Sequence, residues 1–191
     1  MTISMFKIIC VTNRNICQGD FLERIEAIGK EKPDALILRE KDLSEAEYEA
    51  LAQSVLKICS RHQLPCILHN FPEAAKILHH PAIHLPLPIL RKLPDIEKDF
   101  FKVLGASCHS VEEAMEAEKL GCTYITAGHI FETDCKKGLP GKGIDFLKEV
   151  CQSATIPVYA IGGIGPANID AVREAGAAGA CRMSGFMKNG R

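Results

Sequence analysis

The chain has 191 residues, of which 47% are hydrophobic, and this length is typical of one domain with a single core. Its formal net charge of −1, from 23 basic and 24 acidic residues, argues against binding to nucleic acid or to a membrane surface. No apolar run approaches the ~20 residues of a membrane span, and residues 1–10 lack the pattern of a signal peptide, so we expect a cytoplasmic protein.

Short apolar runs alternate with amphipathic stretches along the chain. The predicted strands are Phe6–Thr12, Ala35–Arg39, Pro65–His69, Ala82–Leu85, Lys102–Ser107, Tyr124–Gly128, Pro157–Ile161 and Gly179–Met183. The predicted helices are Asp20–Lys30, Ser44–Arg61, Ser110–Leu120, Ile144–Ala154 and Ala167–Ala175, with a short final helix at Ser184–Lys188. Two of these helices open with the spacing of a capping box, since Ser44 precedes Glu47 and Ser110 precedes Glu113 by three residues.

Alternation of apolar strands with helices indicates a parallel sheet that is buried on both faces. Eight such units predict a compact (β/α)₈ TIM barrel that spans residues 1–191 as a single domain. Six or seven units would instead form an open doubly wound sheet, which is the alternative fold. The fourth unit is the weakest, because Pro81–Pro88 is short and proline-rich and the helix after it is hard to place.

Nine cysteines are scattered along the chain, and no pair has the C-x-x-C spacing of a zinc ribbon or a redox couple. We interpret most of them as small buried hydrophobic residues in a reducing compartment.

Two glycine-containing turns follow the seventh and eighth predicted strands. Gly162 and Gly163 form the first turn, and Ser184 and Gly185 form the second. Glycine lets the backbone approach a ligand and direct its N–H groups toward it, and these two loops often hold phosphate in barrels of this kind. The sequence therefore predicts a phosphate site at these four residues.

The segment Gly128–Gly143 is too long and glycine-rich for an ordinary connection, and long loops in compact domains are often binding loops. Thr133 and Lys136 are its candidate ligand contacts, although a solvated surface loop would have a similar composition. His129 opens the segment at a strand end, where a histidine can take and give a proton. Position alone does not choose it over the other strand-end histidines, which are His69, His84 and His109.

Polar side chains also follow the second, third and fifth strands. Arg39 and Lys41 could clamp a phosphate or carboxylate, or they could simply pair with Glu40 or Asp42. Asn70 and Ser107 are further candidates for substrate contact.

Four segments stand in the order and spacing of the thiamine phosphate synthase/TenI superfamily, which the chain resembles over essentially its whole length. They are Leu38–Ser44, Gly105–Ser110, Ala160–Ile164 and Met183–Gly185. The run Gly128–Gly138 resembles the corresponding loop of TenI-type thiazole tautomerases.

The resemblance implies an isomerase that aromatises a thiazole carboxylate phosphate, with His129 as the catalytic acid/base and no metal or other cofactor. It places the substrate phosphate at the two glycine turns and assigns Arg39 and Lys41 to anion binding. The ligand that the resemblance implies is therefore a small phosphorylated thiazole. Because related barrels are often dimers, the resemblance also suggests a homodimer.

Two alternatives stay open. The synthases of the superfamily join a pyrimidine pyrophosphate to a thiazole phosphate with Mg²⁺, which is held by carboxylates after the third and fourth strands. Here Asn70 is followed by Phe71, and no acidic residue follows His84 before Asp95, which argues against a synthase. The other alternative is a non-catalytic regulatory barrel that senses a ligand.

Overall fold

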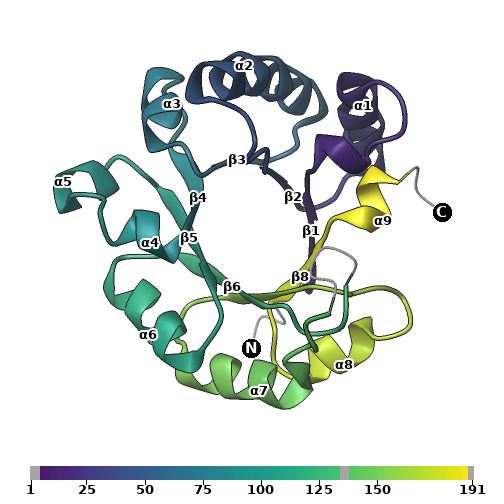
Figure 1. The fold of residues 1–191 in the computed structure, drawn as a ribbon, viewed down its shortest axis with the longest axis vertical. Helices are drawn as coiled ribbons and strands as arrows, with labels where there is room; N and C mark the ends of the chain where they lie inside the picture. The colour runs from purple at the N-terminus through teal and green to yellow at the C-terminus, as the bar shows by residue number, and fades with distance from the viewer. Residues whose placement is uncertain (1–4, 134–137, 189–191) are drawn as a thin grey trace.

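The computed structural model describes residues 5–133 and 138–188. Its strands form one closed parallel barrel in which each strand pairs with the next and the last pairs with the first (Figure 1). The strands are β1 (Lys7–Val11), β2 (Ala35–Leu38), β3 (Cys66–His69), β4 (Ala82–Pro86), β5 (Val103–Cys108), β6 (Tyr124–Gly128), β7 (Val158–Ile161) and β8 (Gly179–Arg182). The pairing of Ile9 with Cys181 closes the ring, which confirms the predicted (β/α)₈ barrel and excludes the open sheet.

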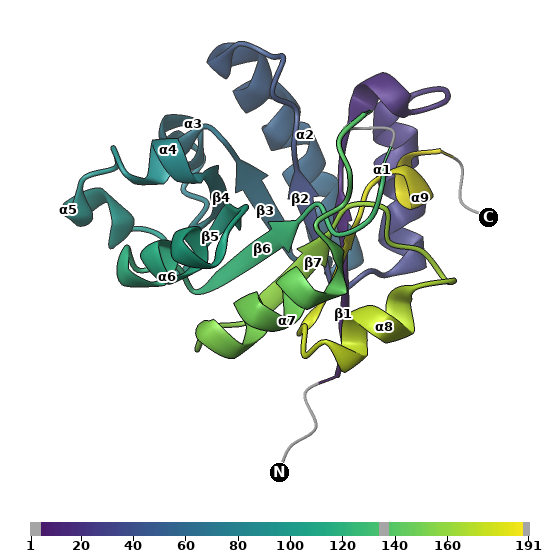
Figure 2. The same cartoon turned by 60° about the horizontal axis from the view of Figure 1, so that its bottom comes forward.

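The helices lie outside the ring of strands, and Figure 2 shows α6, α7 and α8 along the outer side of the sheet. They are α1 (Phe21–Glu31), α2 (Glu45–His62), α3 (Pro72–Ile77), α4 (Leu87–Leu90), α5 (Asp95–Lys98), α6 (Val111–Lys119), α7 (Gly143–Ser153), α8 (Ile169–Glu174) and α9 (Ser184–Met187), with a 3₁₀ turn η1 (Arg14–Ile16) after β1. The sequence analysis did not predict α3, α4 or α5, because helices of four to six residues are too short to show a helical period.

Helix capping follows the sequence at two of the predicted starts. At α2, Ser44 and Glu47 form the complete capping box. At α6, the Ser110 hydroxyl accepts from the Glu113 N–H, but the Glu113 carboxylate accepts from the His109 N–H at 2.5 Å. The second box is therefore only half formed, and Glu113 instead supports the loop at the end of β5.

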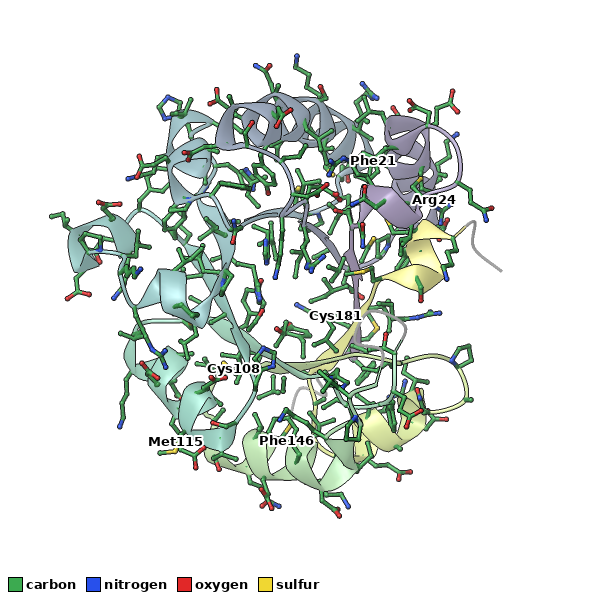
Figure 3. The ribbon with its side chains drawn as sticks, in the orientation of Figure 1. Phe21, Arg24, Cys108, Met115, Phe146 and Cys181 are labelled. Carbon is green, nitrogen blue, oxygen red and sulfur yellow. The ribbon has the colours of Figure 1, made fainter. Side chains whose placement is uncertain are left out.

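Two apolar clusters stabilise the fold. The larger one fills the space between the sheet and the helices. The smaller one fills the barrel interior, where Cys181 lies near the axis while Met115 lies on the outer surface (Figure 3). Tyr124 belongs to this inner cluster, and it packs so closely on Gly105 that a Cβ there would lie 2.5 Å from the phenol oxygen. Gly105 is therefore required to admit the Tyr124 ring.

The cysteines of the described residues are all free, and most are buried, as predicted for small apolar side chains; Cys135 lies outside the described residues. Within residues 5–133 and 138–188, no helix is both long and apolar enough to cross a membrane.

Candidate active site

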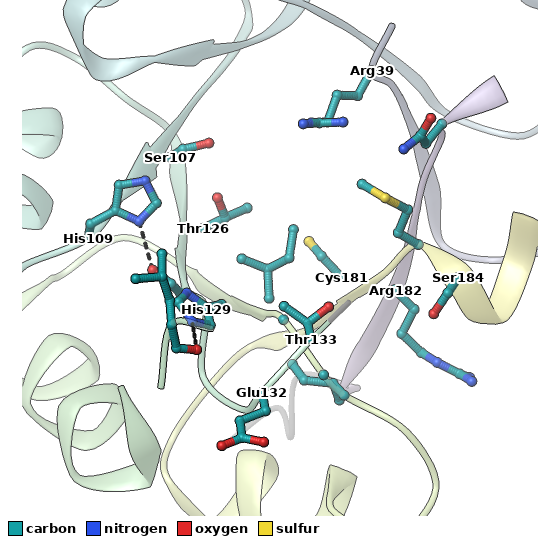
Figure 4. A pocket seen from close by; sticks show the side chains of 18 of the residues that line it. Arg39, Ser107, His109, Thr126, His129, Glu132, Thr133, Cys181, Arg182 and Ser184 are labelled. Carbon is teal, nitrogen blue, oxygen red and sulfur yellow. Dashed lines mark hydrogen bonds between the residues drawn. The ribbon is translucent and has the colours of Figure 1, made fainter. Parts of the chain in front are cut away.

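A cavity of about 1420 Å³ opens at the carboxyl ends of the strands. Its walls come from the ends of β1, β2, β4, β5, β6, β7 and β8 and the segments that follow them (Figure 4). Of the predicted site residues, the cavity is lined by Arg39, Lys41, Ser107, His129, Thr133, Gly162, Gly163, Ser184 and Gly185. The barrel thus brings nine predicted residues from five loops around one space.

The two remaining predicted residues are Asn70 and Lys136. Asn70 does not line the cavity; it adopts a left-handed conformation with φ 74°, and its N–H donates to the His84 carbonyl at 3.1 Å. Lys136 lies outside the described residues.

One wall of the cavity carries the cations Arg39 and Lys41. The residue between them, Glu40, is only 2% exposed and accepts from the Thr12 hydroxyl at 2.6 Å and from the Arg14 backbone N–H. Glu40 is thus engaged by Thr12 and Arg14.

Asp42 is likewise engaged elsewhere, because both of its carboxylate oxygens accept from the Arg14 guanidinium at 2.7 Å. These hydrogen bonds from Arg14 lower the pKa of the Asp42 carboxyl to about 2. Both carboxylates that the sequence offered as partners for Arg39 and Lys41, Glu40 and Asp42, are thus engaged by Arg14.

Another part of the wall, after β7 and β8, carries the glycine turns. Gly162 and Gly163 adopt φ values of +101° and +66°, which L side chains rarely adopt. The Gly162 carbonyl accepts from the Phe131 N–H at 3.1 Å, so this turn also supports the segment that follows His129. Ser184 and Gly185 stand beside it at the start of α9. Backbone N–H groups of such turns can bind an oxyanion.

His129 lines the cavity and is 8% exposed. Its Nε2 lies 3.3 Å from the Leu139 carbonyl, and its Nδ1 is buried without a hydrogen-bond partner in the described residues. The return segment of the loop also binds the His129 carbonyl through the Lys142 N–H at 2.9 Å. The ring is therefore held by its own loop.

The strand-end histidines His69 and His84 occupy the barrel interior side of the site. Their rings stack with centroids 5.7 Å apart, and both are almost fully buried. The pKa of His69 is lowered to about 2, mainly by burial and then by the neighbouring His84 and Lys41, and the pKa of His84 is lowered to about 3 by burial and by Lys41. Both imidazoles are therefore neutral at physiological pH.

Arg182 is a cavity residue that the sequence analysis missed. It ends β8, so the strand-end rule that selected the other candidates could have found it. Its Nε is buried without a hydrogen-bond partner in the described residues, and its guanidinium lies so close to Gly185 that a Cβ there would be 2.7 Å from one of its nitrogens. Figure 4 shows the side chain running behind Ser184. Arg182 therefore places positive charge behind the second glycine turn.

We expect Arg182→Met to weaken binding of inorganic phosphate roughly three- to tenfold, because a positive charge close to an anion contributes about 1 kcal/mol or more. Titration calorimetry measures the change. Arg173→Met on α8 is the matched control, since this arginine pairs with Asp170 on the outer surface. Equal affinities of the Arg182 and Arg173 variants would contradict the role of Arg182.

The carboxylates that would hold Mg²⁺ in the synthases of the superfamily are replaced here by other residues after β3 and β4, so these positions do not fit that metal site. Phe71 stands after Asn70 and packs on Tyr48 with ring centroids 4.6 Å apart, while Pro86 and Leu87 follow His84-Leu85. No group of three or more His, Cys, Asp or Glu side chains suited to a metal ion occurs in the described residues. The cavity carboxylates are instead Glu113, in the first turn of α6, and Glu132, in the loop after β6.

Comparisons with known proteins agree on one family. The sequence pattern of a family described as thiamine monophosphate synthase matches residues 8–186. A thiamine-phosphate synthase of Clostridium acetobutylicum is 31% identical over 186 residues, covering 95% of this chain and 87% of that protein. Another, of Fusobacterium nucleatum, is 33% identical over 191 residues, covering 98% and 92%. The solved structure of a thiamine phosphate pyrophosphorylase from Pyrococcus furiosus matches with a TM-score of 0.81 and 26% identity, covering 96% and 88%.

These relatives overturn the predicted thiazole tautomerase activity and, with it, the isomerase class. The prediction depended on the single loop Gly128–Gly138 and on the missing carboxylates, whereas similarity to proteins named thiamine-phosphate synthase extends over nearly the whole chain. A barrel with a phosphate-binding rim suits either chemistry, so one loop with a strand-end histidine does not determine the reaction.

Proposed function

Because this chain belongs to the thiamine monophosphate synthase family, we propose that it is a transferase that joins a pyrimidine pyrophosphate to a thiazole phosphate. In this reaction the thiazole nitrogen forms a C–N bond to the pyrimidine methylene carbon. The C–O bond to pyrophosphate breaks, and its electron pair leaves with the pyrophosphate.

The observation that carries the proposal is one cavity with candidate anion-binding groups at two places on its wall, after β2 and after β7 and β8. Its volume of about 1420 Å³ exceeds the ~300–1,000 Å³ of a typical single-ligand pocket, which supports two substrates bound together. Arg39 and Lys41 would hold the pyrophosphate, and the turns at Gly162-Gly163 and Ser184-Gly185 would hold the thiazole phosphate. Two anchored substrates react as if at high local concentration, which is a large source of rate.

Charge neutralisation of the leaving group is assigned to the protein's own cations. A hydrogen-bond network that fixes the backbone of Arg39 supports this assignment, since the Arg39 N–H donates to the Thr12 hydroxyl at 2.9 Å, and Thr12 in turn donates to buried Glu40. An arginine fork can bind two phosphate oxygens at once.

The proposal is tested by incubating the purified protein with both substrates and measuring pyrophosphate release and product formation, in parallel with MgCl₂ and with EDTA. Product formation in either buffer supports a synthase. Absence of product in both buffers, with either substrate in excess, contradicts it.

We expect Arg39→Gln to lower kcat/KM about 10- to 100-fold, because a charge-assisted hydrogen bond contributes roughly 1.5–3 kcal/mol. Arg173→Gln on the outer surface is the control and should keep full activity. Thermal unfolding should be the same for both variants, and an unchanged kcat/KM for Arg39→Gln would remove Arg39 from the site.

A further inference from the structure

A chain of three polar side chains runs from the barrel interior to the cavity. The Tyr124 hydroxyl lies 2.9 Å from His84 Nδ1, and His84 Nε2 lies 2.8 Å from Ser107 Oγ. Tyr124 and His84 are 5% and 2% exposed, whereas Ser107 lines the cavity. Figure 4 shows the Ser107 hydroxyl pointing into the open space on the side of Arg39.

The direction of the hydrogen bonds follows from the phenol. Tyr124 is a neutral phenol, because burial raises its pKa well above the ordinary value. Among the hydrogen bonds of the described residues, His84 Nδ1 is the only acceptor for its O–H. If His84 donated from Nδ1 instead, the buried phenol proton would have no acceptor, at a cost of about 1–3 kcal/mol.

The His84 tautomer is therefore settled by the Tyr124 donor. With Nδ1 accepting, a neutral imidazole carries its single proton on Nε2. That N–H donates to Ser107 Oγ, and the Ser107 proton is left to point away from His84 into the cavity.

This hydrogen-bond direction excludes another interpretation of the same three residues, in which Ser107 is a nucleophile. A serine beside a histidine can act as a nucleophile when the ring nitrogen accepts its proton. Here His84 Nε2 already carries the proton of the neutral imidazole, so it cannot accept the proton of the Ser107 hydroxyl. Ser107 is thus not an activated nucleophile, and its own proton is left available for an acceptor in the cavity.

We propose that Tyr124 and His84 are positioning residues that turn the Ser107 hydroxyl outward as a donor to a phosphoryl oxygen of the bound substrate. This rests on the proposed function insofar as the ligand is a phosphate ester or a pyrophosphate. The donor is uncharged and stands across from Arg39, so it adds orientation to an anion that the cations attract. Gly105 leaves room for the first residue of this hydrogen-bonded series, because a side chain at position 105 would displace the Tyr124 ring.

The first test measures the tautomer of His84 in the wild-type protein by ¹⁵N NMR of its imidazole, assigned with His84→Gln. We expect the Nε2–H form, and we expect the Nε2 resonance to shift when inorganic pyrophosphate is added in EDTA buffer. The Nδ1–H form would overturn the proposal, because Ser107 would then have to donate to His84. The measurement is made on the wild-type protein, and only the assignment depends on a folded variant, His84→Gln.

The second test is a double-mutant cycle on the affinity for inorganic pyrophosphate in EDTA buffer, measured by calorimetry. We expect Ser107→Ala to weaken binding about tenfold and Tyr124→Phe about threefold, with no further loss when both are combined. Tyr159→Phe is the matched control, since this buried ring packs on Tyr124 with centroids 5.6 Å apart but does not belong to the hydrogen-bonded chain. It should leave the affinity unchanged.

If Tyr124→Phe lowers the pyrophosphate affinity by the same factor in the wild-type protein and in the Ser107→Ala variant, Tyr124 has a merely structural role and the proposal is overturned. An unchanged affinity of Ser107→Ala would also overturn it. The synthase assay is independent of these results. Failure of that assay together with an intact cycle would contradict the proposed reaction and leave the positioning chain standing.

Discussion

Gly162→Ala should destabilise the protein by about 3–5 kcal/mol and abolish measurable binding of inorganic phosphate. At φ +101° an L residue is strained by about 1–3 kcal/mol. In addition, the new Cβ would lie 2.7 Å from His129 Cα and against the His129 Cβ. Because the His129 Cα is backbone and its Cβ is fixed to it, the turn or the end of β6 must move, and overpacking of this kind costs a further ~1–3 kcal/mol.

Gly165→Ala is the matched control for this variant. Gly165 lines the same cavity in the same loop, but nothing lies within 4 Å of a Cβ placed there and its φ is not in the left-handed region. Chemical denaturation and phosphate titration of the two variants should therefore separate clearly. Equal stability of Gly162→Ala and Gly165→Ala would show that the turn relaxes freely.

Acid should destabilise the protein by about 4 kcal/mol between pH 7 and pH 5 through two buried histidines alone. Their pKa values are lowered in the folded state, to about 2 for His69 and about 3 for His84, against about 6.5 for an unfolded chain. Below pH 6.5 the unfolded state therefore binds more protons than the folded state. By linkage, stability is complete above pH 6.5 and is lost as pH falls toward the folded-state values, at up to about 1.4 kcal/mol per pH unit for each histidine.

Urea denaturation at a series of pH values from 8 to 4.5 measures this slope. The double variant His69→Gln/His84→Gln should lose stability at pH 7 but show a much flatter pH dependence than wild type. Tyr159→Phe, which alters the same interior without removing an imidazole, should keep the wild-type slope. A wild-type slope in the double variant would assign the acid sensitivity to other groups.

Much of the fold could be predicted from local patterns. The strands β1–β8 are nearly continuous apolar runs, and their parallel pairing follows from the helices between them. The start of α2 could be predicted to the residue, because the Ser44–Glu47 box acts within one turn. Strand-end position also selected nine of the residues that line the cavity, since parallel strands bring their carboxyl ends to one rim.

Other features depend on residues that only the folded barrel brings together. His84 lies 40 residues from Tyr124 and 23 from Ser107, and nothing in their spacing indicates a hydrogen-bonded chain. The engagement of Glu40 and Asp42 by Arg14, and the place of Arg182 behind the glycine turn, are likewise contacts across the rim.

The prediction of the reaction from one local segment was wrong. The loop Gly128–Gly138 indicated an isomerase, whereas relatives that match nearly the whole chain are named synthases. By itself the sequence determined the periodicity, the caps and the glycine turns, since these act between near neighbours. Closure of the ring, and with it the burial of the histidines and the size of the cavity, was decided by the tertiary structure. The physical reason is that burial and hydrogen-bond partners are properties of a closed surface to which all eight strands contribute.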